Sequence, residues 1–377
     1  MAIFLLVLSI ILFVGLVVVH ELGHFWVARR NGVVAEEFGI GFPPRAWSRK
    51  VGKGKKQFIF SLNWLPIGGF VKLKGEHDAD TEPGSFGAAN TWAKTKIMLA
   101  GVLVNLGIAL VMLMVLAWVG MPQLVKNQFK VASDTKAINS TVLVGYIEPN
   151  SPASKAGLQV RDQLQAIGMP GNMKTVKTAD TLPAITQQFA GKTVDVTILH
   201  DKQHLTKKVT LRSANEVDQA KKSGKPVGYL GVSPSEYSLA RSTWSAPVVA
   251  LGTAWQFTAL TFQGLGSAIS SIFHGHAAQA SEQVSGPVGI FVVLKTSSLL
   301  GYQFMLLIIA IISLTLAIMN VLPVPALDGG RLYVMLISRL FKKPLTEKAE
   351  ELIYGGSYLF LLALIVLITI SDVKKYF

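Results

Sequence analysis

Cysteine is absent from the 377-residue chain, which excludes disulfide bonds and metal sites with thiolate ligands. Acidic residues are few, because 22 Asp and Glu against 36 Lys and Arg give a formal net charge of +14. No nucleic-acid-binding motif accompanies this positive charge, and much of it flanks apolar segments. We therefore expect the basic residues to lie near a membrane surface, and we predict no nucleic-acid partner.

The apolar N-terminal segment lacks a basic n-region and a cleavage site of small residues, so it is predicted to be a retained span rather than a signal peptide. Half of all residues are hydrophobic and the mean hydropathy is +0.44, which is too apolar for an ordinary soluble protein. Four segments approach the ~20 residues that a bilayer requires, at about 2–27, 97–120, 302–322 and 352–370. The fold class that follows is a multi-pass α-helical membrane protein with four transmembrane helices.

A long polar stretch separates the second and third predicted spans. Patterns such as "KTVDVTIL" and "KKVTLR" alternate apolar and polar residues, which indicates β-strands in a translocated soluble domain. The semi-apolar stretch 246–273 would, as a fifth span, place the basic loop after the third span on the outer face, so we predict an interfacial or amphipathic helix instead. The predicted domains are an N-terminal membrane part at 1–124, a soluble domain at 125–235, an interfacial linker at 236–301 and a C-terminal membrane part at 302–377.

Glycine and proline interrupt the region at about 38–75, where "QFIFSLNWL" is typical of a strand. We predict a membrane-associated β-hairpin or small sheet there. Such backbone is tolerated at membrane depth only where it packs in protein or lines a wet cavity. An edge of this sheet, including Ile59 and Phe60, could pair with an extended substrate peptide.

The stretch "HELGH", residues 20–24, matches the zinc-protease signature H-E-x-x-H. On a helix, His20 and His24 are one turn apart and can bind one zinc ion, while Glu21, about 100° around the helix, can take a proton from the attacking water. The alternative is a chance polar triplet at a helix end. Two histidines and a glutamate inside an apolar span are costly unless they serve a function, so the metal interpretation is favoured.

A catalytic zinc needs a third protein ligand and an open position for water. Asp328, in "NVLPVPALDGGRL", is the only acid between Gln283 and Thr346. A helix cap or a turn before Gly329 is its alternative role. The four-span topology places Asp328 on the same side of the membrane as His24, whereas five spans would separate them.

Together, "HELGH" and "NVLPVPALDG" around an intervening domain resemble the bacterial site-2 protease family of intramembrane zinc metalloproteases. The segments "GIGFPP", "LPIGGFVKLKGE", "EPGSFGAANTWAK" and "SGPVGI" also match, so the resemblance covers nearly the whole chain. One departure is Val102, where the family usually has proline. The resemblance implies one Zn²⁺ per chain with His20, His24 and Asp328 as ligands and Glu21 as the general base.

The resemblance also implies that Asn320, Pro323 and Pro325 contact substrate, although Asn320 could equally hydrogen-bond between helices. The segment "VGYIEPNSPASKAGLQVRDQLQAIG" resembles a bacterial PDZ domain, so the inserted α+β domain is expected to be PDZ-like. Tyr229, Leu230 and Gly231 would then form its peptide groove. Whether the domain is a receptor for new C-termini or a size filter stays open.

The function implied is hydrolysis of peptide bonds within or near transmembrane segments. Expected partners are the lipid bilayer and single-span membrane proteins, such as pre-trimmed anti-sigma factors or remnant signal peptides. The expected location is a bacterial inner membrane, with the soluble domain extracytoplasmic and the active site towards the cytoplasm. A tethered soluble-type metalloprotease would need a third ligand soon after His24, and "FWVARRNG" offers none. A non-catalytic membrane-anchored PDZ scaffold would leave Glu21 and Asp328 unexplained.

Overall fold

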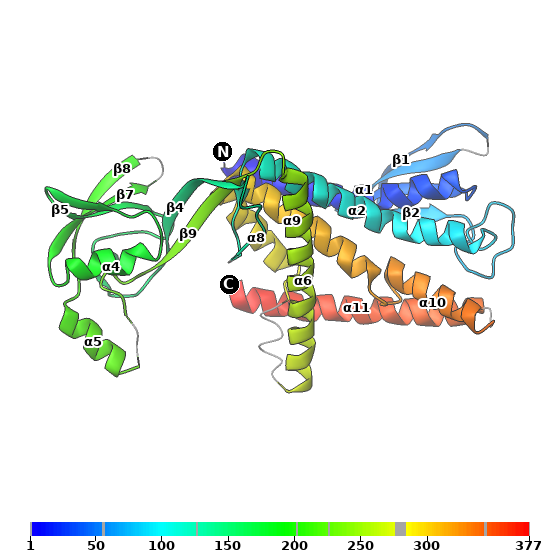
Figure 1. Ribbon diagram of the computed structural model, residues 1–377. Coiled ribbons are helices and arrows are strands. Elements are labelled where there is room, and N and C mark those ends of the chain that lie inside the picture. Colours follow the sequence, from blue (N-terminus) through cyan, green and yellow to red (C-terminus); the bar gives the residue numbers. More distant parts are fainter. Residues whose placement is uncertain are drawn as a thin grey trace. The chain divides into compact units, whose positions relative to one another are not determined.

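The computed structural model describes residues 2–54, 57–125, 127–200, 203–224, 227–275, 284–342 and 345–376. The chain forms two compact units (Figure 1). The first unit comprises residues 1–119, 129–131 and 244–377, and the second comprises residues 120–128 and 132–243.

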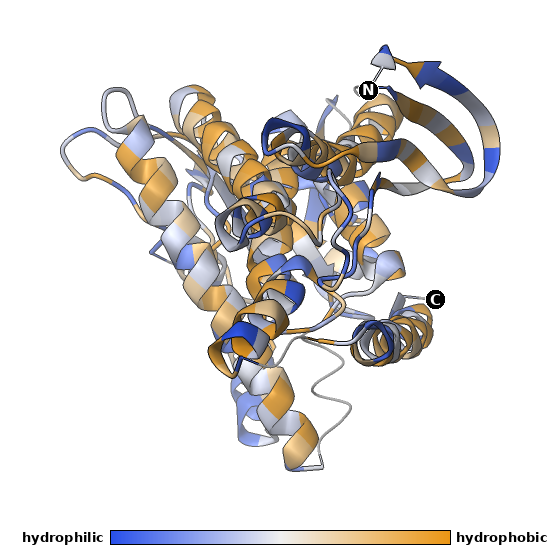
Figure 2. Cartoon of the chain, turned by 90° about the vertical axis from the view of Figure 1, so that its right-hand side faces the viewer, coloured by the Kyte–Doolittle hydropathy of each residue, from blue (hydrophilic) through white to orange (hydrophobic). Residues whose placement is uncertain are grey.

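Among the described residues, four helices, all in the first unit, are long and apolar enough to cross a membrane, the same number as the predicted spans. They are α1 (Ala2–Arg30), α2 (Thr91–Val119), α9 (Tyr302–Val321) and α11 (Glu347–Tyr376). Figure 2 shows hydrophobic residues along these helices in orange. Helix α1 continues for a further turn and a half beyond the "HELGH" motif, so the motif lies within a continuous helix.

The predicted interfacial linker contains two helices that belong to the helix bundle. Helix α6 (Ala246–Phe273) packs against α2 and α9, and α8 (Pro287–Leu300) packs against α1, α9 and α11. Helix α6 is not among the four candidate spans. The prediction of a helix at 246–273 is confirmed, but the prediction of a linker is wrong for the described part, because both helices bury side chains in the bundle. Residues 276–283 lie outside the described residues.

The predicted hairpin near the motif consists of β1 (Ala35–Val51) and β2 (Phe58–Leu73), which pair antiparallel. Each strand folds back on itself, since the first half of β1 pairs with both halves of β2. The result is four short segments in the order 45–51, 58–62, 35–40 and 69–73. Gly41 adopts a φ of 78° at the fold of β1, where a Cβ atom would overlap the carbonyl of Leu65.

The second unit is an antiparallel sheet with three helices. Its strand order is β3-β9-β4-β5-β7-β8, with β6 paired to β5. The strands are β3 (Met121–Pro122), β4 (Lys136–Ile147), β5 (Gln163–Met169), β6 (Asn172–Thr175), β7 (Thr193–His200), β8 (Gln203–Thr210) and β9 (Val232–Arg241), and the helices are α3 (Pro152–Lys155), α4 (Thr181–Gln188) and α5 (Ala214–Lys222).

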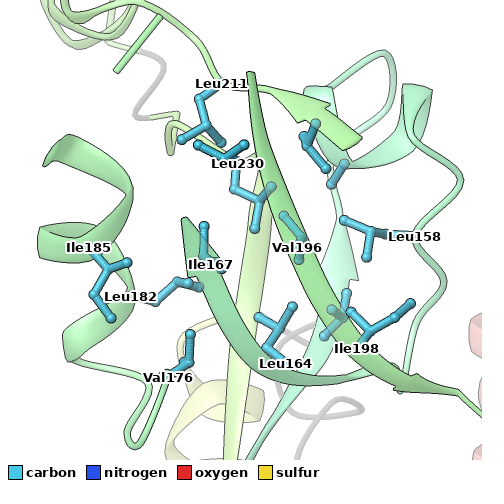
Figure 3. Packing of buried hydrophobic residues seen from close by; sticks show 14 of the residues in the cluster. Leu158, Leu164, Ile167, Val176, Leu182, Ile185, Val196, Ile198, Leu211 and Leu230 are labelled. Carbon is cyan, nitrogen blue, oxygen red and sulfur yellow. The ribbon is translucent and has the colours of Figure 1, made fainter. Parts of the chain in front are cut away.

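The core of the second unit follows the period-two burial of its strands. Val194, Val196 and Ile198 alternate with more exposed residues along β7 and belong to one hydrophobic cluster with Leu182 and Ile185 of α4. Figure 3 shows Val196 and Ile198 on one side of this core and Leu182 and Ile185 on the other. The predicted boundary at residue 235 is wrong, because β9 remains paired with β4 as far as Arg241.

Helix α11 is fastened near its C-terminal end by a buried carboxylate. Asp372 is 3% exposed, and its Oδ2 accepts the backbone N–H groups of Gly286, at 2.9 Å, and Gly289, at 2.7 Å. These two residues flank the start of α8 in the segment "SGPVGI". A Cβ atom at Gly286 or Gly289 would lie about 3 Å from this carboxylate, so glycine is the residue that lets the helices approach.

Asp372→Ala is expected to lower the free energy of unfolding by about 2–4 kcal/mol, because two buried N–H groups lose their acceptor. Equilibrium unfolding in mixed detergent micelles would measure the change. Asp372→Asn keeps a side-chain oxygen and should lose less. Equal stability of the wild type and Asp372→Ala would show that this carboxylate does not fasten α11.

Candidate metal centre

The two histidines of the motif lie on one face of α1, as the i, i+4 spacing requires. Their rings are 4.8 Å apart between centroids, and their Nε2 atoms are 3.2 Å apart. Both residues are less than 10% exposed. Two imidazole rings of an apolar helix are therefore buried edge to face, where each polar nitrogen needs a hydrogen-bonding or metal partner.

Asp328 reaches the histidines from the other end of the chain. It is the first residue of α10 (Asp328–Leu340), and its Oδ2 lies 3.0 Å from His20 Nε2 and 3.2 Å from His24 Nε2. The alternative role as a helix cap is not what the structure shows, because Leu327 is the N-cap residue and makes no side-chain cap bond. The side chain of Asp328 points instead at the imidazole nitrogens.

The turn before α10 depends on the paired glycines that follow Asp328. A Cβ atom at Gly329 would overlap the carbonyl of Val321, and one at Gly330 would overlap the carbonyl of Val324. Pro323 and Pro325 lie in this turn between α9 and α10. The proline-containing turn thus folds directly onto the glycines and fixes where α10, and with it Asp328, begins.

The three ligand atoms could hold one metal ion, since they lie 3.0, 3.2 and 3.2 Å from one another. A tetrahedral zinc with bonds of about 2.1 Å separates its ligand atoms by roughly 3.4 Å, close to this spacing. Two imidazoles and a carboxylate are also a donor set that zinc accepts in catalytic sites. Burial raises the pKa of the Asp328 carboxyl, but hydrogen bonds with both histidines outweigh burial and hold this pKa below its ordinary value.

Room for an ion between the histidines depends on a glycine in the neighbouring helix. A Cβ atom at Gly101 of α2 would lie 2.5 Å from the Nε2 atoms of both His20 and His24. The missing side chain thus leaves open the space where three ligand atoms converge. Gly101 was not predicted as a site residue, although it stands in "AGVLVN".

Helix α2 also contacts the far nitrogen of each ring. His24 Nδ1 lies 2.7 Å from the backbone carbonyl of Ile97, and His20 Nδ1 lies 3.2 Å from the side-chain nitrogen of Asn105. A carbonyl can only accept, so His24 donates a hydrogen bond from Nδ1, and loss of its other proton from Nε2 would leave a lone pair there for a metal ion. This orientation is the one that a metal ligand needs.

Glu21 lies at the same centre and lines two cavities that open beside it. One, of about 190 Å³, includes His24, Asp328 and Val71 in its lining, and the other, of about 220 Å³, includes His20 and Asn320. The backbone amide of Val71 hydrogen-bonds to Glu21. A carboxylate beside the ligand atoms and next to open space can exchange protons with a water molecule there.

Of the three predicted substrate-contacting residues, only Asn320 lies at the centre. Asn320 lines the cavity with His20 and Glu21, but its side-chain nitrogen donates to the carbonyl of Leu316 in its own helix, at 3.0 Å. A bond between helices, the alternative for Asn320, is therefore not the one seen. Pro323 and Pro325 shape the turn that precedes Asp328.

The prediction that Ile59 and Phe60 form a free strand edge is wrong. Both residues pair on two sides, Ile59 with Lys50 and Glu37, and Phe60 with Arg49 and Phe38. The strand edge that adjoins the site is 69–73. The amides of Val71 and Leu73 face away from β1, towards Glu21 and the carboxylate of Glu76. The residue types of "QFIFSLNWL" predict a strand, but they do not give the register or the order of the segments.

The predicted peptide-groove residues lie in the second unit. Leu230 is 2% exposed and belongs to the hydrophobic core of that unit, so its side chain is not available to a ligand (Figure 3). The carbonyls of Tyr229 and Gly231 accept the backbone N–H groups of Arg212 and Glu148. The segment therefore closes the core of the unit.

Comparison with known proteins finds a matching family model and several similar proteins that are named zinc metalloproteases. A sequence model described as peptidase family M50 matches residues 8–364. The chain is 31% identical over 371 residues to the Clostridium perfringens (strain 13 / Type A) protein named "Putative zinc metalloprotease CPE1693", with 98% of each chain covered. It is 29% identical to "Putative zinc metalloprotease CA_C1796" of Clostridium acetobutylicum, covering 99% of this chain and 98% of the relative, and 26% identical to "Putative zinc metalloprotease SACOL1281" of Staphylococcus aureus (strain COL), covering 98% and 97%.

Gly101→Ala is expected to weaken zinc binding by about tenfold to a hundredfold, because an added methyl group would occupy the space between the ligand nitrogens and overpacking costs about 1–3 kcal/mol. Metal content after dialysis and titration with a fluorescent zinc chelator would measure the loss. Gly107→Ala is the matched control, since a Cβ atom there meets nothing within 4 Å on the same helix. If Gly101→Ala bound zinc as tightly as Gly107→Ala, the ion would not lie beside Gly101.

Proposed function

Since the chain belongs to peptidase family M50, a family of metalloproteases, we propose that it is an intramembrane zinc endopeptidase with one zinc per chain. The observation that carries the proposal is the convergence of His20, His24 and Asp328 to within 3.2 Å. The two histidines lie on the apolar helix α1 together with Glu21. Three protein ligands that leave a position open for water are the arrangement of a catalytic zinc site.

Zinc, when bound, polarises the scissile carbonyl and makes water a better nucleophile near neutral pH. Glu21 accepts the proton from the attacking water and then delivers it to the leaving amine. The cavities on either side of Glu21 give the water and the peptide room to approach. The polar groups of the site are screened from lipid by α2, α9 and the β1–β2 ribbon, which pack against α1.

A transmembrane helix hides its own peptide bonds, because its backbone groups are paired internally. The substrate must therefore be extended before it reaches Glu21. The edge strand 69–73 supports this step, because the outward amide of Val71 lies beside the proposed base. An extended peptide added to that edge would satisfy its own backbone at membrane depth and pass the metal centre.

The proposed substrates are single-span membrane proteins, either pre-trimmed regulators such as anti-sigma factors or remnant signal peptides. A site inside an apolar helix supports this class, since a soluble substrate would have to leave water to reach it. The basic residues that follow α1, including Arg29 and Arg30 in its last turn, support a cytoplasmic position for this end of the helix in a bacterial inner membrane. The second unit would then be extracytoplasmic, as a PDZ-like receptor or size filter.

Glu21→Gln should retain zinc and lose about 100- to 10,000-fold in the rate of cleavage, because an amide cannot accept the proton from water. Asp328→Ala should lose both zinc and cleavage. Purified variants in detergent or liposomes, assayed for metal content and for cleavage of a single-span substrate, would test both. Asp218→Ala, an exposed carboxylate of α5, is the control and should match the wild type. Full turnover by Glu21→Gln would contradict the role of the base, and full zinc occupancy in Asp328→Ala would contradict the ligand set.

Val71→Pro should impair cleavage of a transmembrane substrate while zinc stays bound. Proline removes the outward N–H of the edge strand, which hydrogen-bonds to Glu21, and so disturbs both the proposed base and the edge at which substrate would pair. Val71→Ala keeps the N–H and should retain most activity. Equal cleavage by the two variants in a kinetic assay would show that neither the bond to Glu21 nor substrate pairing at this position is needed.

A further inference from the structure

One stripe of α2 faces the proposed metal ligands. Ile97, Gly101 and Asn105 are four residues apart, which places them on one side of the helix. The carbonyl of Ile97 contacts His24, Gly101 leaves the space between the rings, and the amide of Asn105 contacts His20. The carbonyl of Ile97 and the space at Gly101 each have an evident role, and the contact of Asn105 needs a closer account.

The side chain of Asn105 is buried and only half satisfied. The residue is 1% exposed, its Nδ2 lies 3.2 Å from His20 Nδ1, and its Oδ1 has no hydrogen-bond partner among the described residues. Asn105 Oδ1 is the one side-chain atom in the described part of the chain that is buried in this way. A buried amide oxygen without a donor costs about 1–3 kcal/mol, so its presence beside the centre calls for a reason.

The proton on His20 decides which end of the amide faces the ring. If Nδ2 donates to Nδ1, a neutral His20 must carry its proton on Nε2, the atom that points at Asp328 and His24. A protonated Nε2 cannot bind a metal ion. Half a turn of the amide about its last side-chain bond brings Oδ1 to His20, where it accepts the Nδ1 proton and leaves the Nε2 lone pair free. Either orientation makes one hydrogen bond to the ring, so a metal ion at Nε2 selects the second.

We propose that Asn105 is a positioning residue for the metal centre, whose side-chain oxygen accepts the Nδ1 proton of His20 and so holds the imidazole in the form that binds zinc. The inference rests on the proposed zinc site. It makes α2 the outer support of both imidazoles, with a backbone carbonyl behind His24 and a side-chain carbonyl behind His20. Groups behind ligand histidines in this way fix ring orientation and raise ligand basicity.

The side chain of Asn105 can be changed without disturbing its backbone. Its backbone carbonyl accepts a hydrogen bond from the Ser313 hydroxyl of α9, at 2.8 Å, and this bond holds α2 and α9 together independently of the amide. Ser313→Ala therefore removes a buried contact of the same residue and leaves the contact with His20 in place. It is the control for general damage to the bundle.

The test measures zinc affinity of the purified full-length protein by competition with a chelator, together with the visible absorption of the cobalt-substituted protein. Asn105→Leu keeps the volume but removes the acceptor, and it should weaken zinc binding by about 10- to 100-fold and alter the cobalt spectrum. Asn105→Asp offers only acceptors, and it should bind zinc at least as tightly as the wild type. Ser313→Ala should match the wild type in both measurements.

Three results would overturn the inference. Unchanged affinity in Asn105→Leu would show that His20 needs no support from α2. Asn105→Asp binding as weakly as Asn105→Leu would show that the amide acts as a donor or a filler. A wild-type protein that binds no zinc would overturn the proposed function along with it, whereas the first two results leave the zinc site standing.

Discussion

The structure of the first unit depends on three polar side chains that must satisfy one another inside an apolar bundle. His20, His24 and Asp328 converge to within 3.2 Å, and only the histidines come from adjacent turns of one helix. Buried imidazoles and a partly buried carboxylate are costly when alone, so the surrounding elements are constrained to keep the three side chains together. Gly101 keeps α2 from filling the space between the rings, and Gly329 and Gly330 let the turn after α9 fold tightly enough to deliver Asp328.

Much of this could be predicted from local patterns. Apolar runs identify the four spans, and the i, i+4 spacing of the motif places both imidazoles on one face. Asp328 needed a topological argument, since nothing in its own neighbourhood separates a ligand from a helix cap. Asp328 was selected as the candidate ligand for two reasons. It is the only acid in a long stretch, and the four-span topology puts it on the same side of the membrane as His24.

The remaining features depend on contacts between elements that sequence patterns do not specify. The segment "QFIFSLNWL" indicated a strand at Ile59 and Phe60, but the folding back of β1 and β2 makes that strand central. The pattern of a single sequence shows which face of a strand each side chain occupies, but it does not show which strands lie beside that strand. Leu230 shows the same limit in the second unit, where a segment that resembles a peptide groove contributes its side chain to the core. Asn105 and Gly101 could have been found only by asking which positions of α2, four residues apart, face the motif.

Helix α2, which contacts the two histidines, and the strand 69–73, at which substrate is proposed to bind, contact α1 at different residues. Helix α2 contacts the imidazole nitrogens that point away from the ligand cluster, whereas the strand 69–73 contacts Glu21 through the amide of Val71. Ligand orientation is thus set by a rigid helix, and the base is set by the backbone of a strand edge. The strand 69–73 is an edge of its sheet, so the element that holds Glu21 is also the one at which we propose that an extended peptide binds. In the proposed mechanism, binding of an extended peptide and the placement of Glu21 are coupled through a single backbone segment, while α2 contacts the two histidines proposed as metal ligands.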